Sequence, residues 1–447
     1  MESSTRDLVR KFRKMNSDQA LLYFDSYADA DMVKVFELFT VGERLAVENA
    51  AIRWKELAPM AWSRTTTEDV CDYFKSKKDL TMDDVISVLE RCAQFLTHIC
   101  LKVSHHKIKH ATDVRKGEKL FKLLTDKAER VQKIHWDFEV PVEPLMKFYE
   151  ARIHQLEEHD NKDYCSVKTD RVMRLLKKAQ SLKTFNWTLG VPERCLFYRT
   201  RSILEALPED LTTLNINCTE DEFSIETLFR PLERFENLRS FSFTGGARLS
   251  TDRTVGAPAQ LPASVEHVEI DRFGEREFIR CFRDVNSLRH LSITGGKFRA
   301  DDLVKLVEQN PNLEHLALRD MDYLCEKQFA IVAGLPNLTS LHLHRLLRLD
   351  GPSFTSLKKL QVLHVSYCRR VWLESIIELA DVAENLHEIQ IAENPMPKTE
   401  ELRQCLNTLA KERECTITLE VLNPDKKKRK HYSFPNDSIF SCLNRSR

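Results

Sequence analysis

Most of the chain repeats a short pattern of apolar positions, L-x-x-L-x-L, in which Val, Ile, Phe or Trp can replace Leu. Clear copies begin at residues 211, 238, 265, 288, 313, 338, 360 and 386, so successive copies start 27, 27, 23, 25, 25, 22 and 26 residues apart. Weaker copies begin at residues 96, 131 and 182, at longer spacings of 35, 51 and 29 residues. Alternating apolar and polar positions predict a short strand with one buried face.

Helical segments separate the predicted strands, as in residues 300–310, where Leu303, Leu306 and Val307 fall on one face. A strand and helix of this length cannot bury their apolar faces alone, so neighbouring units must stack into a solenoid. The pattern resembles the leucine-rich repeat. The resemblance implies an α/β horseshoe, with parallel strands inside and helices outside, over residues 91–422. We expect a helical insertion near residues 141–180, within the 51-residue gap.

Two amphipathic stretches precede the repeats. Residues 31–39 carry apolar side chains at i, i+3, i+4 and i+7 of a helix: Met32, Val35, Phe36 and Phe39. Residues 40–57 open with Thr40 three residues before Glu43, which is the spacing of a capping box. A mostly apolar stripe follows, in which we expect Arg53 to contribute only its aliphatic stem: Leu45, Ala46, Ala50, Arg53, Trp54 and Leu57.

Residues 27–62 resemble an F-box. Phe36 matches the central Phe of the motif, Phe39 the end of that helix, and Trp54 and Leu57 the terminal pair, whereas Tyr27-Ala28 and Ala50-Ala51 replace the usual Leu-Pro and Val-Cys. The resemblance implies a surface that binds a Skp-type adaptor of a cullin–RING ubiquitin ligase: Met32, Val35, Phe36, Phe39, Leu45, Ala50, Trp54 and Leu57. An F-box before leucine-rich repeats is the arrangement of SCF-type substrate receptors, whose repeats hold a protein target.

A second interpretation of these N-terminal helices stays open. Solenoids need an end cap, so the helices could serve only to close the repeats of a scaffold or inhibitor that has no link to ubiquitin.

Polar residues beside the second apolar position of each repeat should line the inner face of the strands. They include five histidines and three charged residues, which we take as the candidate target-binding surface: His267, Glu269, Arg289, His290, His315, His342, His364 and Glu388. Histidine titrates near neutral pH, so binding there should be pH-sensitive. The alternative is that these are ordinary solvent-facing strand positions. Ligands spread along a ladder lack a tetrahedral arrangement, so no metal is expected.

Composition narrows the partners. Sixty-eight basic residues balance 68 acidic ones, so the chain has no overall attraction to nucleic acid or anionic membranes. Twelve dispersed cysteines suit a reducing compartment, and no apolar run approaches the roughly 20 residues that a membrane span needs. We therefore expect a cytoplasmic or nuclear protein. No nucleotide-binding or hydrolase motif is present, so we expect neither enzymatic activity nor a cofactor.

Two basic segments remain. The run Lys426, Lys427, Lys428, Arg429 and Lys430 could be a nuclear-localisation signal, a nonspecific nucleic-acid contact or part of a solvated tail. His106 and His110 have helical spacing but lack a companion carboxylate, which favours a solvated basic face. The expected domains are a polar segment (1–20), the helical module (21–65), a connector (66–90), the repeats (91–422) and a basic tail (423–447).

Overall fold

The structure is a computed structural model. It describes residues 2–15, 27–50, 52–77, 79–101, 113–136, 142–161, 169–189, 196–218, 229–247, 260–273, 281–295, 300–321, 323–368, 370–392, 399–412, 417–422 and 430–434. The chain divides into two compact units. The first comprises Met1–Asn186 with Ala206–Pro208, and the second comprises Trp187–Glu205 with Glu209–Arg447. None of the described helices is both long and apolar enough to cross a membrane.

The first unit begins with a helical module: α1 (Glu2–Phe12), α3 (Asp29–Glu37), α4 (Val41–Ala50), α5 (Ile52–Ala61) and the 3-10 helix η1 (Trp62–Arg64). The capping box at the start of α4 is confirmed. The Thr40 N–H donates to Glu43 Oε2 at 2.8 Å, and the Glu43 N–H donates to Thr40 Oγ1 at 3.3 Å. One hydrophobic cluster joins α1, α3, α4 and α5, so the module has a core of its own.

The first repeats follow in the same unit: α6 (Thr67–Ser76), α7 (Met82–Cys92), β1 (His98–Leu101), α8 (Val114–Lys127), β2 (Lys133–Trp136), α9 (Val142–Arg152), η2 (Ile153–Gln155), β3 (Glu158–Asn161) and α10 (Thr169–Leu176). β1 pairs with β2, and β2 with β3, in parallel. Capping boxes begin both α6 and α7.

Residues 141–180 hold a complete repeat, not only the inserted helices that we expected. Strand β3 lies between α9 and α10 and joins the parallel sheet, with His159 opposite Ile134. The strand has no apolar alternation, because His159 and Asn161 occupy the positions that apolar side chains take elsewhere. Only Leu156 marks it, 25 residues after Val131 and 26 before Leu182. The 51-residue gap is thus two ordinary repeats.

The second unit continues the pattern: α11 (Leu196–Ala206), β5 (Thr213–Cys218), η4 (Arg230–Arg234), β6 (Ser240–Ala247), β7 (His267–Phe273), β8 (His290–Thr294), α13 (Ala300–Gln309), β9 (His315–Arg319), α14 (Glu326–Ala333), β10 (Ser340–His344), β11 (Val362–Ser366), α15 (Leu373–Val382), β12 (Glu388–Ala392), α16 (Thr399–Glu412), β13 (Ile417–Leu422) and β14 (Lys430–Phe434). Strand β4 (Thr184–Leu189) spans the boundary between the units.

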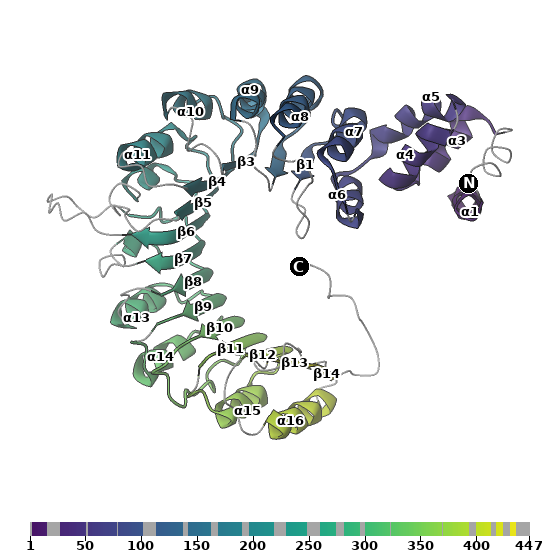
Figure 1. Ribbon diagram of the computed structural model, residues 1–447. Coiled ribbons are helices and arrows are strands. Elements are labelled where there is room, and N and C mark those ends of the chain that lie inside the picture. The colour runs from purple at the N-terminus through teal and green to yellow at the C-terminus, as the bar shows by residue number, and fades with distance from the viewer. Residues whose placement is uncertain are drawn as a thin grey trace. The chain divides into compact units, whose positions relative to one another are not determined.

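Strands β5 to β13 pair in chain order, and every pair is parallel. In this unit the strands form one layer, and α13, α14, α15 and α16 lie on its outer side (Figure 1). Alternate strand residues such as Leu291 and Ile293 are buried between the layers. This α/β arrangement is a leucine-rich repeat solenoid. β14 is the last strand of the sheet and pairs antiparallel to β13.

The same kind of turn follows each of four successive strands, β8 to β11. The residue after β8, β9, β10 and β11 has φ of +69° (Gly295), +55° (Asp320), +50° (Arg345) and +55° (Tyr367). The N–H of each donates to the last carbonyl of the next strand, at 2.7 to 3.0 Å. Left-handed backbone is costly for residues other than glycine, so these bonds hold the turns in place.

Candidate functional site

The residues expected to bind an adaptor form the core of the helical module. Met32, Val35 and Phe36 are fully buried, and Phe39, Trp54 and Leu57 expose no more than 6% of their surface. Leu45 is half-buried. Ala50 ends α4, and its side chain lies outside the described part.

Helix α1 supplies part of this core. The Phe12 ring centroid lies 4.6 Å from that of Phe39 and 6.0 Å from that of Trp54. Val9 is buried in the same cluster, and Leu8 packs against it. At the end of α1, the Arg13 guanidinium bonds the Glu43 carboxylate at 2.7 Å. Helix α1 therefore covers the aromatic residues that the F-box resemblance assigns to the adaptor.

Arg53 does more than its aliphatic stem suggested. Its guanidinium donates to Asp29 Oδ1 at 2.7 Å and to the Tyr27 carbonyl at 2.6 Å, which ties α5 to the start of α3. The two partners of Arg53 lie far from it in the sequence, so the local apolar stripe did not predict these bonds.

Arg44 is a buried cation that sequence reasoning missed. It donates to the Phe36 carbonyl at 2.9 Å, the Glu37 carbonyl at 2.7 Å and Thr65 Oγ1 at 2.5 Å. The two carbonyls end α3, where the helix dipole favours a positive charge. Burial lowers the pKa of this guanidinium from its ordinary value. Arg44 thus fixes the C-terminal end of α3 to η1.

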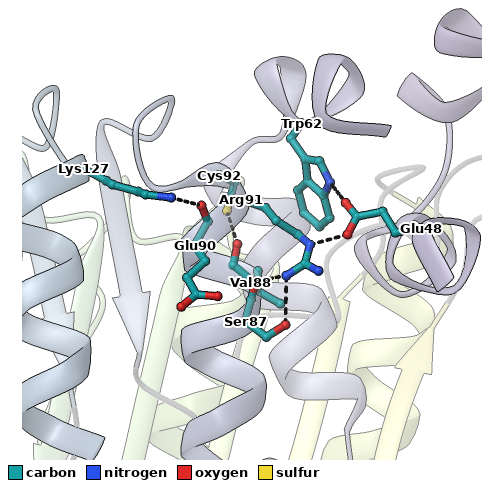
Figure 2. A network of polar contacts seen from close by, with 8 residues as sticks. All are labelled: Glu48, Trp62, Ser87, Val88, Glu90, Arg91, Cys92 and Lys127. Carbon is teal, nitrogen blue, oxygen red and sulfur yellow. Dashed lines mark hydrogen bonds and ion pairs between the residues drawn. The ribbon is translucent and has the colours of Figure 1, made fainter. Parts of the chain in front are cut away.

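A second polar group joins the module to the first repeat (Figure 2). Glu48 of α4 accepts a hydrogen bond from the Trp62 indole N–H at 2.5 Å, and its other oxygen pairs with Arg91 of α7. Arg91 also donates to the Ser87 carbonyl at 2.6 Å. Both Glu48 and Trp62 are buried, so the carboxylate is held by two donors in a nearly dry setting. We call these three residues, Glu48, Trp62 and Arg91, the junction triad.

The predicted inner-face histidines lie in two rows. In the first row, His267, His290 and His315 open adjacent strands in register. Their ring centroids lie 5.7 and 5.6 Å apart along the row. His290 Nε2 is 3.6 Å from Glu269 Oε1, and this contact is the main reason that the Glu269 pKa is lowered. Burial, followed by the charge of His290, lowers the pKa of His315.

The second row lies at the middle of β10 and β11. His342 and His364 face each other in register with ring centroids 4.2 Å apart. His364 Nε2 lies 2.7 Å from Glu388 Oε1. Burial, followed by the charge of His364, lowers the pKa of His342 to about 4. His342 is therefore neutral around pH 7, and a pH switch near neutrality cannot rest on it.

Arg289 lies just before β8 and pairs with Glu314. The two rows, with Glu269, Arg289 and Glu388, give the inner face of the second unit a mixed-charge polar surface. Such a surface is suited to a protein partner.

The first unit carries a related row that sequence reasoning missed. The His98 and His135 rings meet edge to face at 5.1 Å, and His135 Nε2 lies 3.5 Å from Glu158 Oε1. Asn186 Nδ2 donates to the same Glu158 oxygen at 3.3 Å. Burial lowers the pKa of His98, whereas the His135 contact lowers the pKa of Glu158. Glu158 belongs to β3, so this row was hidden together with that strand.

Three other features were singled out in the sequence. No group of three or more His, Cys, Asp or Glu residues within the described ranges is arranged to hold a metal ion. The two basic segments lie mostly outside those ranges, at residues 105–110 and 426–429, so what we expected of them there stays a prediction. Lys430 begins β14, so the segment expected as a tail contributes a strand to the sheet.

Known proteins resemble the chain in structure and not in sequence. No family model and no curated protein sequence matches the chain. Among solved structures it is similar to yeast Rad7 in its complex with Elc1, at 12% identity and a TM-score of 0.49 over 88% of this chain and 92% of that one. It is also similar to an internalin (InlF) of Listeria monocytogenes, at 11% identity and a TM-score of 0.39 over 77% of this chain and 87% of that one. A leucine-rich repeat protein of Leptospira interrogans is similar at 15% identity and a TM-score of 0.31, over 74% of this chain and 92% of that one.

Proposed function

We propose that this protein is the target-binding subunit of an SCF-type ubiquitin ligase. The helical module would dock a Skp-type adaptor of a cullin–RING ligase, and the inner face of the repeats would bind a protein target in the cytoplasm or nucleus. Such a subunit performs no chemistry. It acts by raising the effective concentration of the target near the enzyme that transfers ubiquitin.

The observation that carries this proposal is the separate core of the helical module. Among the described residues, its hydrophobic cluster draws on α1, α3, α4 and α5 and on no repeat, so the module is more than a lid over the first strand. The junction triad then fastens this core to α7. A module that has its own core and is also fastened to the first repeat supports a separate docking function beside the repeats.

Helix α1 decides how an adaptor would reach the module. Phe12 and Val9 pack on Phe39 and Trp54, two of the residues that the F-box resemblance assigns to the adaptor. Adaptor and α1 would compete for the same aromatic face. The adaptor should therefore bind weakly while α1 is in place and more tightly once it is removed.

Retention of a purified Skp-type adaptor tests the proposal. Three forms of the protein are compared: the full chain, a form lacking residues 1–15, and full-length Phe12→Asp, which places a charge under α1 and leaves every residue of α3, α4 and α5 unchanged. We expect both altered forms to bind the adaptor at least tenfold more tightly than the full chain. Arg10→Asp, on the exposed side of α1, is the matched control and should leave affinity unchanged.

The result against the proposal is equally definite. If neither the shortened form nor Phe12→Asp retains the adaptor while circular dichroism shows both folded, the module is not an adaptor-binding F-box. Phe36→Ala and Trp54→Ala are poor tests, because each empties a buried core position and would cost about 3–5 kcal/mol of stability.

The same burial favours a second candidate function. Because the assigned adaptor residues are enclosed with α1, the module could serve as the N-terminal cap of a leucine-rich repeat protein that binds its partner without any ubiquitin ligase. A folded protein that binds no adaptor in any of the three forms, yet still binds a target through its repeats, would establish this alternative.

A further inference from the structure

Large apolar side chains are exposed on the loops that follow β9, β10 and β11. Tyr323 exposes 60% of its surface, Trp372 56%, Leu347 46% and Tyr367 38%. Exposed aromatic residues that gather on neighbouring loops are the usual mark of a contact surface. Arginines lie among them, and Tyr, Trp and Arg are the residue types that dominate binding energy in protein interfaces. We call Tyr323, Leu347, Arg348, Tyr367, Arg370 and Trp372 the aromatic–arginine edge.

Direct contacts connect the first two loops. The Arg348 guanidinium carbon lies 5.4 Å from the centre of the Tyr323 ring, within the range of a cation–π contact. Arg345 pairs with Asp320 at 3.0 Å. The loops after β9 and β10 therefore present one continuous surface.

The third loop is held to the second in the same way. Arg370 pairs with Asp350 at 3.5 Å, and the Gly351 N–H donates to the Arg370 carbonyl at 2.9 Å. The Trp372 ring packs directly on Gly351. A β-carbon at residue 351 would lie 3.2 Å from two atoms of that ring. Glycine at residue 351 lets the ring approach the backbone this closely, so the exposed indole has a defined position.

Each loop is anchored from beneath. Buried side chains alternate with the exposed ones, and all expose 3% or less of their surface: Met321, Leu324, Leu346, Leu349, Cys368 and Val371. The exposed residues are therefore held on a rigid base. An interface built on such a base loses little conformational entropy on binding.

Charge indicates the partner. Four described arginines lie on or beside the edge (Arg319, Arg345, Arg348 and Arg370), against Asp320 and Asp350 on the loops and Glu326 and Glu374 in the first turns of α14 and α15. Both aspartates are already paired, with Arg345 and Arg370. The charge of Arg319 acts on Glu269 of the inner face, whereas Arg348 forms no ion pair with a carboxylate of the described residues. Arg348 thus gives the surface a positive charge that has no carboxylate partner among the described residues, beside the exposed Tyr323 ring.

We propose that the aromatic–arginine edge binds an acidic protein segment that carries at least one large apolar side chain. The apolar side chain would pack on Trp372 and Tyr323, and carboxylates would pair with Arg348 and its neighbours. This proposal deepens the target-binding half of the proposed function and needs no adaptor. It names the chemistry of a target segment and places part of its contact beyond the inner-face histidines.

Selection from a displayed library of random 12-residue peptides on the immobilised full chain tests the edge. We expect the enriched peptides to share acidic residues around an aromatic or long aliphatic one. We expect their affinity to fall at least tenfold for Trp372→Ala and for Arg348→Glu. The control Ile331→Ala with Arg283→Glu changes an exposed apolar residue and an exposed arginine outside the edge, and it should bind as the unchanged chain does.

Several results would overturn the proposal. These are no enrichment, a neutral or basic consensus, or enriched peptides that bind the two edge variants as well as the unchanged protein. Tight binding of a 12-nucleotide oligo(U) that the edge variants abolish would assign the edge to nucleic acid instead. Concentration-dependent dimerisation abolished by the same variants would assign it to a second copy of this chain. Because no adaptor is present, failure here leaves the adaptor experiment unaffected.

Discussion

Replacing Glu48 with alanine should loosen the junction between the helical module and the first repeat. The Trp62 side chain is fully buried, so its N–H would lose its acceptor and find no water, which costs about 2 kcal/mol. The Arg91 side chain is 29% exposed and can turn toward solvent, so losing its carboxylate partner costs only about 1–2 kcal/mol, below the 3–5 kcal/mol typical of a fully buried pair. The expected loss is therefore about 3–4 kcal/mol.

Native-state hydrogen exchange on the full chain measures this loss where it occurs. A global unfolding curve is unsuitable, because a chain of two units need not unfold in one step. Amides of α7 should exchange at least 100-fold faster in Glu48→Ala, since each 1.4 kcal/mol corresponds to about a factor of ten. Glu205→Ala is the control. It breaks an exposed ion pair with Arg201, at 2.8 Å, and should change exchange less than threefold.

A double-mutant cycle separates coupling from mere truncation. Glu48→Ala and Arg91→Ala together should cost at least 1 kcal/mol less than the sum of the two single changes. If the α7 amides of Glu48→Ala exchange no faster than those of the control, or if the two costs simply add, the triad does not hold the junction.

Three further changes have definite expected outcomes. Asn310→Ala should lower the stability of the second unit by about 3 kcal/mol in urea unfolding. The fully buried Asn310 amide accepts from the Leu288 N–H and donates to the Val285 and Leu306 carbonyls, at 2.9 to 3.0 Å, and alanine would lose all three bonds. A loss no larger than that caused by the exposed change Glu326→Ala would contradict this. The folded-state pKa of His342, about 4, lies below its ordinary 6.5, so the unfolded chain takes up a proton first and stability falls as pH drops from 6.5 toward 4. His342→Gln should therefore make stability less dependent on pH between 7.5 and 5, and an unchanged slope would refute the assignment. Gly351→Ala should destabilise by about 1–2 kcal/mol and shift the fluorescence of Trp372, because φ is +52° and the ring occupies the space; an unaltered spectrum would show that the ring is not seated there.

The repeats were predictable because their signal is local. Leu288, Leu291 and Ile293 satisfy the pattern within six residues, and all three are buried as expected. β3 escaped prediction because the polar His159 stands in register with the apolar Ile134, so only the spacing of Leu156 from its neighbours carried the signal. The histidine rows followed from strand alternation. The pKa values of these histidines could not be predicted from the sequence, because burial and neighbouring charges depend on the strands on either side.

The junction was unpredictable for a different reason. Glu48 and Arg91 are 43 residues apart, and no spacing rule links a helix of the module to one of the first repeat. The burial of Phe39 and Trp54 under α1 likewise depends on a helix that the F-box resemblance did not include. Local patterns thus identified the elements, whereas contacts between distant elements required the three-dimensional structure.

The left-handed turns after β8 to β11 also indicate where this chain tolerates changes in length. Successive turn residues are 25, 25 and 22 residues apart, yet each strand keeps five residues and each turn keeps the same bond to the next repeat. The three-residue difference falls in the outer segment between β10 and β11, where no helix forms between residues 345 and 361. Insertions and deletions are thus accommodated on the outer side of the solenoid. A single residue added between Leu341 and Leu343 of β10 would instead reverse the alternation within the strand and turn one of these two buried side chains toward solvent.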